Sequence, residues 1–247
     1  MVRINLADKS ENLLTGELNL DPTLREMSVE FEVTSIGVSN NHRWLYLGDS
    51  EGRVHSFTVP ALEESEVIPV SDGEIPAISM LLGGISVLAG DSMGRVSQLF
   101  PVRGEDNRFH LQPIRTFTGS DGAVERVITE QRRKGFITLD EADNLNVFHS
   151  TSGRHVLQES LAATKPRAIA LSPRANGLLI ERSDASMQML QIENEHPEVS
   201  FSTLWSKVWY ENYEEPEYVW QSSASTNEFE PKFSLTPLVF GTIKAAF

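Results

Sequence analysis

A repeat of about 42 residues is the feature that most limits the folds open to this sequence. Each unit has a short apolar run, a tight polar turn and a second run in which apolar and polar residues alternate. This order of segments predicts a β-hairpin in every unit. Four segments superimpose, at 43–57, 85–99, 134–148 and 176–190.

The turns carry the residues that tight hairpins need. The first two are Asp49-Ser-Glu-Gly52 and Asp91-Ser-Met-Gly94. An aspartate can accept hydrogen bonds from the turn backbone, and glycine can adopt a positive φ. Asp49, Asp91 and Asp140 occupy equivalent positions and could instead converge on a cation. Because Arg182 stands at the fourth equivalent position, hairpin capping is the favoured interpretation.

Further apolar segments flank each hairpin. Ile36, Ile78, Val127 and Ile169 occupy one column upstream, and strand-like segments follow at 66–70, 114–117 and 155–157. Three or four short strands per unit at this period are typical of a β-propeller blade. The units resemble WD40-like blades, although the Gly-His and Trp-Asp pairs of the standard repeat are missing.

We therefore expect an all-β fold, a β-propeller-like array of about four or more WD40-like blades over residues 28–195. Residues 1–27 are expected to form N-terminal strands that could close a blade. Residues 196–247 are expected to form a less regular, acidic and aromatic juxtamembrane segment. The sequence leaves open how many blades there are and whether the ring closes.

Composition narrows the function. A net charge of −14 disfavours nucleic acid, which proteins bind through Lys and Arg contacts to phosphate. The absence of cysteine excludes disulfides, thiolate nucleophiles and cysteine-ligated zinc. No run of about 18 apolar residues occurs. The C-terminal residues 233–247 nevertheless become progressively more apolar, as at the beginning of a membrane segment.

The segment after the repeat combines acidic and aromatic residues. Nine Asp and Glu lie between Glu193 and Glu230, against Lys207 alone. Aromatic side chains at this density suit a boundary between water and lipid headgroups, or packing against the propeller. The candidate membrane-interface anchors are Trp205, Trp209, Tyr213 and Trp220.

This tail resembles a segment of the permease subunit of bacterial phosphate ABC transporters. The resemblance rests on Leu204-Trp-Ser-Lys-Val-Trp-Tyr-Glu211, on 216–223 and on the Pro237-x-x-x-Gly241-Thr242 element. In that family a Trp-x-x-x-Trp element precedes an apolar Pro-x-x-x-Gly-Thr element that leads into the transport core. Some members carry an extra domain between the first membrane helix and this element.

The resemblance implies a location and partners. The chain would be the periplasmic loop of a bacterial inner-membrane protein, with one flanking helix before Met1 and another beginning around Thr242. Its partners would be the rest of the same permease, the second permease subunit, the cytoplasmic ATPase subunit and the periplasmic phosphate-binding protein. The implied function is a non-catalytic extracytoplasmic domain that serves phosphate import as a protein-interaction or regulatory platform.

Few residues qualify as site candidates. The histidines form no metal-binding pair, and neither a Gly-x-Ser-x-Gly elbow nor a phosphate loop occurs, so we expect no catalytic residue, metal or cofactor. The basic cluster Arg132, Arg133 and Lys134 could dock an acidic partner or be an exposed turn. Arg53 and Arg95, each following a turn glycine, could contact an anion or pair with nearby acidic residues. The alternative functions are a propeller that senses phosphate or another small anion, and a propeller hydrolase.

Overall fold

The computed structural model describes residues 2–11, 15, 18–163, 166–193, 197, 199–211, 213, 215–219 and 233–247, with only the backbone for 2–11 and 18–25. Within these ranges the chain is almost entirely β-structure, in five antiparallel sheets. Each repeat unit forms one sheet, which we call a blade and number 1 to 4 in chain order.

Blades 1 to 3 each contain four strands that pair in sequence order. Their third strands begin immediately after the hairpin turns that the repeat predicts. Blade 1 contains β3 (Val33–Val38), β4 (Trp44–Asp49), β5 (Arg53–Thr58) and β6 (Glu64–Pro69). Blade 2 contains β7 (Ala77–Met80), β8 (Val87–Gly90), β9 (Arg95–Arg103) and β10 (Phe109–Thr118). Blade 3 contains β11 (Val124–Thr129), β12 (Gly135–Asp140), β13 (Asn144–His149) and β14 (Arg154–Ser160).

Blade 4 has three strands among the described residues: β15 (Pro166–Leu171), β16 (Gly177–Arg182) and β17 (Met187–Gln191). The N-terminal strands β1 (Val2–Glu11) and β2 (Leu18–Met27) pair with each other in a separate two-stranded sheet. They therefore add no fourth strand to blade 4.

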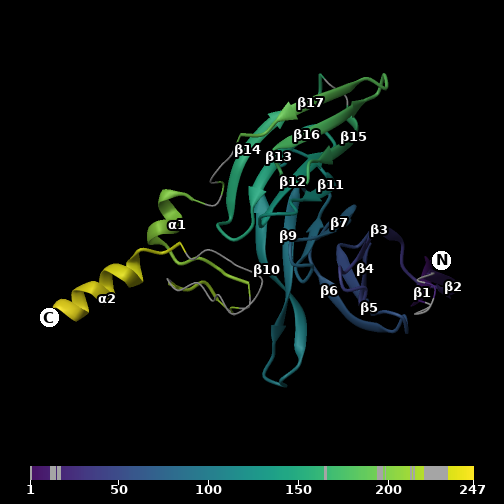
Figure 1. Cartoon of the computed structure of the whole chain (residues 1–247), viewed down its shortest axis with the longest axis horizontal. Coiled ribbons are helices and arrows are strands. Elements are labelled where there is room, and N and C mark those ends of the chain that lie inside the picture. Colours follow the sequence, from purple (N-terminus) through teal and green to yellow (C-terminus); the bar gives the residue numbers. More distant parts are fainter. Residues whose placement is uncertain are drawn as a thin grey trace.

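The blades are arranged in an arc (Figure 1). The first strand of each blade lies innermost, and β7 contacts both β3 and β11. The chain termini lie on opposite sides of the molecule, and the β9–β10 hairpin projects well beyond the other strands (Figure 1). These features confirm the expected all-β, propeller-like array.

Apolar side chains fill the space between consecutive blades. Tyr46, Val54 and Ile68 of blade 1 pack against Val87, Ala89 and Leu99 of blade 2. An aromatic group of Phe117, Phe136 and Phe148 joins blades 2 and 3, with the Phe117 and Phe136 rings edge to face at 4.9 Å. Ile137, Leu139, Leu178 and Ile180 join blades 3 and 4. Burial of these inter-blade layers is the main force that holds the array together.

The two outer faces of the array differ. Residues 27–33 cover Leu45, Leu47 and Phe57 on the outer face of blade 1. Blade 4 leaves Leu179, Met187 and Met189 exposed on its strands.

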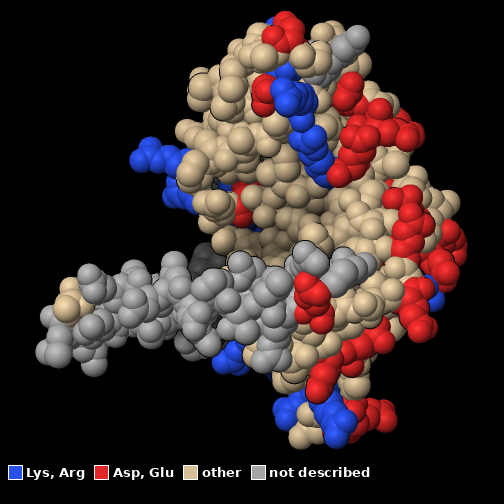
Figure 2. Space-filling model, turned by 90° about the vertical axis from the view of Figure 1, so that its right-hand side faces the viewer, with Lys and Arg blue, Asp and Glu red and all other residues tan. Residues whose placement is uncertain are grey.

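Seen from the side of blade 1, the Asp and Glu side chains form a band along one edge of the molecule, and the middle of this view is hollowed (Figure 2).

Two helices lie in the tail. The short α1 (Phe201–Trp205) begins at Ser200, whose hydroxyl accepts a hydrogen bond from the Thr203 backbone while the Thr203 side chain bonds back. The second helix, α2 (Thr236–Ala246), has Pro237 in its first turn and buries none of its residues. Both helices lie to one side of the blades, and α2 points away from them (Figure 1). Among the described residues, no helix is long and apolar enough to span a membrane.

Candidate functional site

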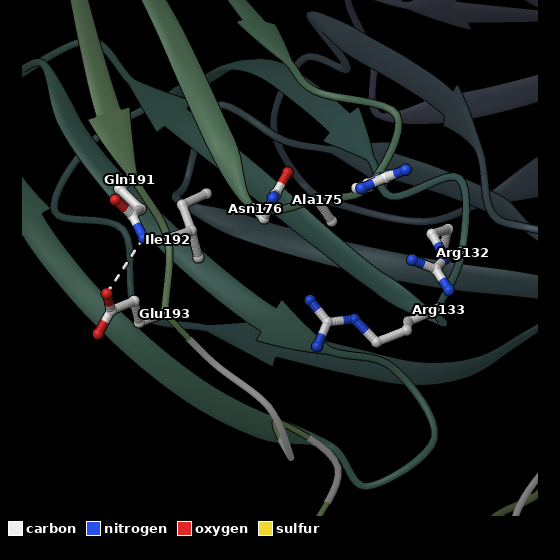
Figure 3. A pocket seen from close by; sticks show the side chains of 8 residues that line it. Arg132, Arg133, Ala175, Asn176, Gln191, Ile192 and Glu193 are labelled. Atoms are coloured by element: carbon white, nitrogen blue, oxygen red, sulfur yellow. Dashed lines mark hydrogen bonds between the residues drawn. The ribbon is translucent and has the colours of Figure 1, made fainter.

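The basic cluster lies in the loop between β11 and β12, where Arg132 and Arg133 form one wall of a pocket. The pocket has a volume of about 790 Å³ and lies between blades 3 and 4. The loop between β15 and β16 and the end of β17 supply the other walls (Figure 3). The lining residues are Arg132, Arg133, Arg174, Ala175, Asn176, Gln191, Ile192 and Glu193, and we call this space the arginine pocket.

A buried carboxylate holds Arg133 in place. Arg133 Nε donates to Glu130 Oε2 at 2.9 Å, and the Glu130 side chain is only 7% exposed. Gly135 leaves room for this carboxylate, because a Cβ at that position would lie 2.6 Å from Glu130 Cδ. The Arg133 guanidinium points into the pocket (Figure 3). The guanidinium is therefore preorganised by the fold.

The opposite wall has a different character. Gln191 Nε2 donates to Glu193 Oε1 at 3.1 Å, and this pair faces Arg132 and Arg133 across the pocket (Figure 3). Cationic groups thus concentrate on the wall formed by the two blade loops. That wall suits a carboxylate or phosphate group of a ligand, since guanidinium matches both in geometry and charge.

Lys134 faces a different region from its two neighbours. Its Nζ donates to the Leu82 carbonyl oxygen at 2.9 Å and forms an ion pair with Glu211 of the tail. Both side chains are nearly buried, at 13% and 10% exposure. Lys134 is therefore bound within the chain, while Arg132 and Arg133 line the pocket.

Glu211 is the centre of a buried polar network that attaches the tail to blades 2 and 3. Ser86 Oγ donates to Glu211 Oε1 at 2.5 Å, and Gln98 Nε2 donates to the same oxygen at 3.3 Å. Ser150 Oγ in turn donates to Gln98 Oε1 at 2.7 Å. We call this network the tail clamp. It fixes the segment that leads to α2 against the blades.

The aromatic candidates in the tail have separate roles. Trp209 Nε1 donates to the Tyr213 carbonyl oxygen at 2.9 Å, and Arg115 bonds to the Trp209 carbonyl oxygen. Tyr213 packs beside the fully buried Tyr210. These contacts hold the tail together.

Trp205 is the aromatic candidate that reaches solvent most fully among those described. It is 45% exposed at the end of α1, and its ring lies 6.4 Å from that of Phe201, which is 81% exposed. The Trp205 carbonyl oxygen accepts a hydrogen bond from Thr236 Oγ1, which joins α1 to α2. Trp220 lies outside the described residues.

Arg53 and Arg95 stabilise hairpin turns. Arg53 Nε donates to Asp49 Oδ2 at 2.6 Å, and Arg95 Nε donates to Asp91 Oδ2 at 2.9 Å. The backbone N–H groups of the turns donate to the other oxygen of each aspartate, and Asp140 accepts similar bonds in blade 3. The aspartates cap hairpins, as the favoured interpretation predicts.

Arg174 is the pocket residue that sequence reasoning missed, although the repeat contains the signal for it. Arg132 and Arg174 occupy the same column when 125–132 is aligned with 167–174. Equivalent loops of consecutive propeller blades lie side by side, so this alignment places the two arginines near each other. Asn176, Gln191 and Glu193 carry no comparable signal.

Comparisons with known proteins show the fold alone. No family model and no curated protein matches the chain. Two similar solved structures are described as "Crystal structure of RRP9 WD40 repeats" and "Structure of U3-55K", with 11% and 10% sequence identity. Both match with a TM-score of 0.50 over 67% of this chain and over 52% and 53% of their own. The chain thus has a WD40-like fold and spans about half the length of these structures.

Proposed function

We propose that this chain is a non-catalytic interaction platform held beside a membrane, as the periplasmic domain of a bacterial phosphate ABC transporter permease. The observation that carries the proposal is α2, an apolar helix that buries no residue and is joined to blades through the tail clamp. The resemblance of this same segment to the permease element supports the assignment.

The surface of α2 is unsuited to water. Its exposed apolar residues include Leu238, Val239, Phe240 and Ile243, and its one charged residue is Lys244. Eleven residues at about 1.5 Å per residue cover about half of a hydrocarbon core of roughly 30 Å. We propose that α2 is the first part of a membrane segment, with Trp205 and Phe201 at the headgroup level, where aromatic rings are favoured.

The tail clamp gives the platform a fixed orientation. Ser86, Lys134 and Ser150, which surround Glu211 and Gln98, come from loops that connect strands within blades 2 and 3. The arginine pocket lies in an equivalent loop region between blades 3 and 4. In our proposal this loop region receives an acidic surface of the periplasmic phosphate-binding protein, with Arg132, Arg133 and Arg174 as contacts.

Vesicle flotation tests the membrane part. Unlabelled zwitterionic vesicles avoid the repulsion that anionic lipid would exert on a chain of charge −14. We expect the intact chain to float with the vesicles and the L238S/F240S variant to bind at least about tenfold less, because two exposed apolar side chains are lost. L157S, which removes an exposed apolar residue of β14, is the matched control and should bind normally. Failure of the intact chain to bind would reject membrane attachment.

Calorimetric titration tests the platform part. Purified phosphate-binding protein, loaded with phosphate, should bind the chain, and R132E/R174E should weaken binding at least about tenfold. Inorganic phosphate alone should give no heat. Heat with phosphate alone would instead favour the sensing function, for which the arginine pocket is the observation in support. A titration with the loaded binding protein that gives no heat of binding would contradict the platform proposal.

A further inference from the structure

A second pocket lies between blades 1 and 2 and differs in chemistry from the arginine pocket. Its volume of about 430 Å³ falls within the range of pockets that bind small ligands or side chains. Aromatic and aliphatic side chains make most of its walls, with a few polar groups among them. The lining includes Trp44, Tyr46, Phe100, Phe109, Leu111 and Glu66, and we call it the aromatic pocket.

Strand register places the polar groups of this pocket in one row. Tyr46 on β4 lies opposite Ser56 on β5, and Ser56 lies opposite Glu66 on β6. Directly opposed residues of antiparallel strands project from the same face of a sheet. Tyr46, Ser56 and Glu66 therefore share the face of blade 1 that lines the pocket.

Tyr46 is the second polar group of the pocket to which the proposal assigns a contact. The residue is 6% exposed and lines the pocket together with Glu66. Burial, together with the negative charge of Glu66, raises the pKa of Tyr46 to about 12. The phenol is therefore neutral at physiological pH. A neutral phenol hydroxyl can both donate and accept a hydrogen bond, so Tyr46 can bind a polar group of a ligand in this pocket.

Glu66 is held in a fixed position beside Tyr46. His110 Nδ1 lies 2.7 Å from Glu66 Oε1, and the Leu111 backbone N–H donates to Glu66 Oε2 at 2.9 Å. A carboxylate has about four acceptor sites, so Glu66 can accept further hydrogen bonds. Its side chain is 26% exposed, which leaves it accessible from solvent.

The surrounding charge favours a cation. Residues 28–75, which include blade 1, contain nine Asp and Glu against Arg43 and Arg53, a net charge of −7 and half of the total for the chain. Figure 2, which views the molecule from the side of blade 1, shows Asp and Glu side chains in a band along one edge. The β9–β10 turn is balanced, since Arg103 and Arg108 offset Glu105 and Asp106.

We propose that the aromatic pocket binds an arginine side chain presented by a partner protein. The apolar stem and planar guanidinium pack against the aromatic walls, while guanidinium N–H groups donate to Glu66 and to the Tyr46 hydroxyl oxygen. An acidic segment is repelled by Glu66 and by the net negative charge of residues 28–75. This site is independent of the permease proposal and of the arginine pocket, because it involves other blades and the opposite charge.

The test uses three capped tripeptides, Ac-Gly-X-Gly-NH₂, in which X is arginine, its neutral isostere citrulline, or glutamate. Binding is followed by the NMR shift of the Trp44 indole N–H. We expect saturable shifts with the arginine peptide, at least fivefold weaker binding of the citrulline peptide and no saturation with the glutamate peptide. Equal binding of the arginine and citrulline peptides, or no shift at Trp44, overturns the proposal.

Two variants connect the binding to the proposed groups. E66Q should weaken binding of the arginine peptide about tenfold. E63Q removes an equal charge from the exposed neighbouring loop and should change the affinity for this peptide less than twofold. Y46F should weaken binding about threefold, because the hydroxyl that contacts the guanidinium is lost, and should leave the unfolding temperature nearly unchanged, since the ring that packs between the blades is kept. Equal effects of E66Q and E63Q would show general charge attraction and overturn the site.

Discussion

The hydroxyl of Ser86 donates to Glu211 Oε1 at 2.5 Å, across a sequence separation of 125 residues. Through this bond, and the ion pair of Glu211 with Lys134, the tail is attached to blades 2 and 3 rather than trailing from blade 4. Glu211 is therefore one of the contacts that set the position of α2, together with the bond from Arg115 to the Trp209 carbonyl oxygen.

Replacing Glu211 should release the tail. E211A leaves Lys134 nearly buried without its anion, a change that costs about 3 kcal/mol in comparable pairs. We expect faster hydrogen exchange at the paired amides of Val208 and Glu217, and faster trypsin cleavage after the exposed Lys207. E215A removes an exposed charge from the same segment and should leave both rates unchanged. Unchanged rates in E211A would show that other contacts hold the tail.

The blades could be predicted from the sequence because their determinants are local. Strands pair with their neighbours in the chain, and the turn residues Asp49, Gly52, Asp91 and Gly94 lie within five residues of the contacts they make in each hairpin. The regular period then predicts that equivalent blades pack side by side. The tail clamp could not be predicted, because nothing in the period relates Glu211 to Ser86 or Lys134.

The two pockets could be predicted from the sequence only in part. Both use loops that join the first and second strands of consecutive blades, so the repeat alignment places Arg132 near Arg174. It also pairs Asn41 with Gly83, the neighbour of the pocket residue Gly84. The depth and volume of the pockets and the placement of Tyr46 beside Glu66 depend on side-chain packing between blades, which one sequence does not specify.

Gly52 occupies a turn that has no room for a side chain. Its φ is +81°, and a Cβ would lie 2.0 Å from the Ser71 carbonyl oxygen. G52A should lower the free energy of unfolding by more than about 3 kcal/mol, because backbone strain and a clash with backbone combine. Gly153 also has a positive φ, +65°, but nothing lies within 4 Å of its Cβ position. G153A should therefore cost only about 1 kcal/mol in chemical denaturation, and equal losses would contradict this account.

His110 links blade 1 to the β9–β10 hairpin in a pH-dependent way. Hydrogen bonds and charge from Asp106 and Glu66 raise the pKa of His110. Because the folded value is raised, the stabilisation is complete below the unfolded pKa of about 6.5 and is lost as pH rises through the folded value. An NMR titration of the His110 ring should show its pKa fall in both D106N and E66Q. A pKa that is unaffected by either substitution would show that these carboxylates do not govern the ring.

Asp49 should make blade 1 sensitive to acid. Burial alone would raise the pKa of its carboxyl group, but hydrogen bonds from His55 and from the backbone and side chain of Arg53 outweigh burial and lower it. The stabilisation from this carboxylate is therefore present above the unfolded pKa of about 3.9 and is lost as pH falls through the lower folded value. D49N should lower the free energy of unfolding at pH 7 by about 1 to 3 kcal/mol, because the neutral amide loses its ion pair with Arg53 and cannot accept every bond.

Thermal unfolding at pH 7 and at about pH 3 tests this dependence on Asp49. The difference between the wild type and D49N should shrink at the lower pH, because pH 3 lies below the unfolded pKa of about 3.9, where the unfolded chain takes up the proton and the advantage of the folded carboxylate declines. D184N is the matched control, because Asp184 is exposed and caps the turn of blade 4 through the Ser186 backbone N–H, with the charge of Arg182 nearby. Its effect should be smaller than that of D49N at pH 7. A difference between the wild type and D49N that stays constant with pH would mean that the shape of the Asp49 side chain, rather than its charge, stabilises the hairpin.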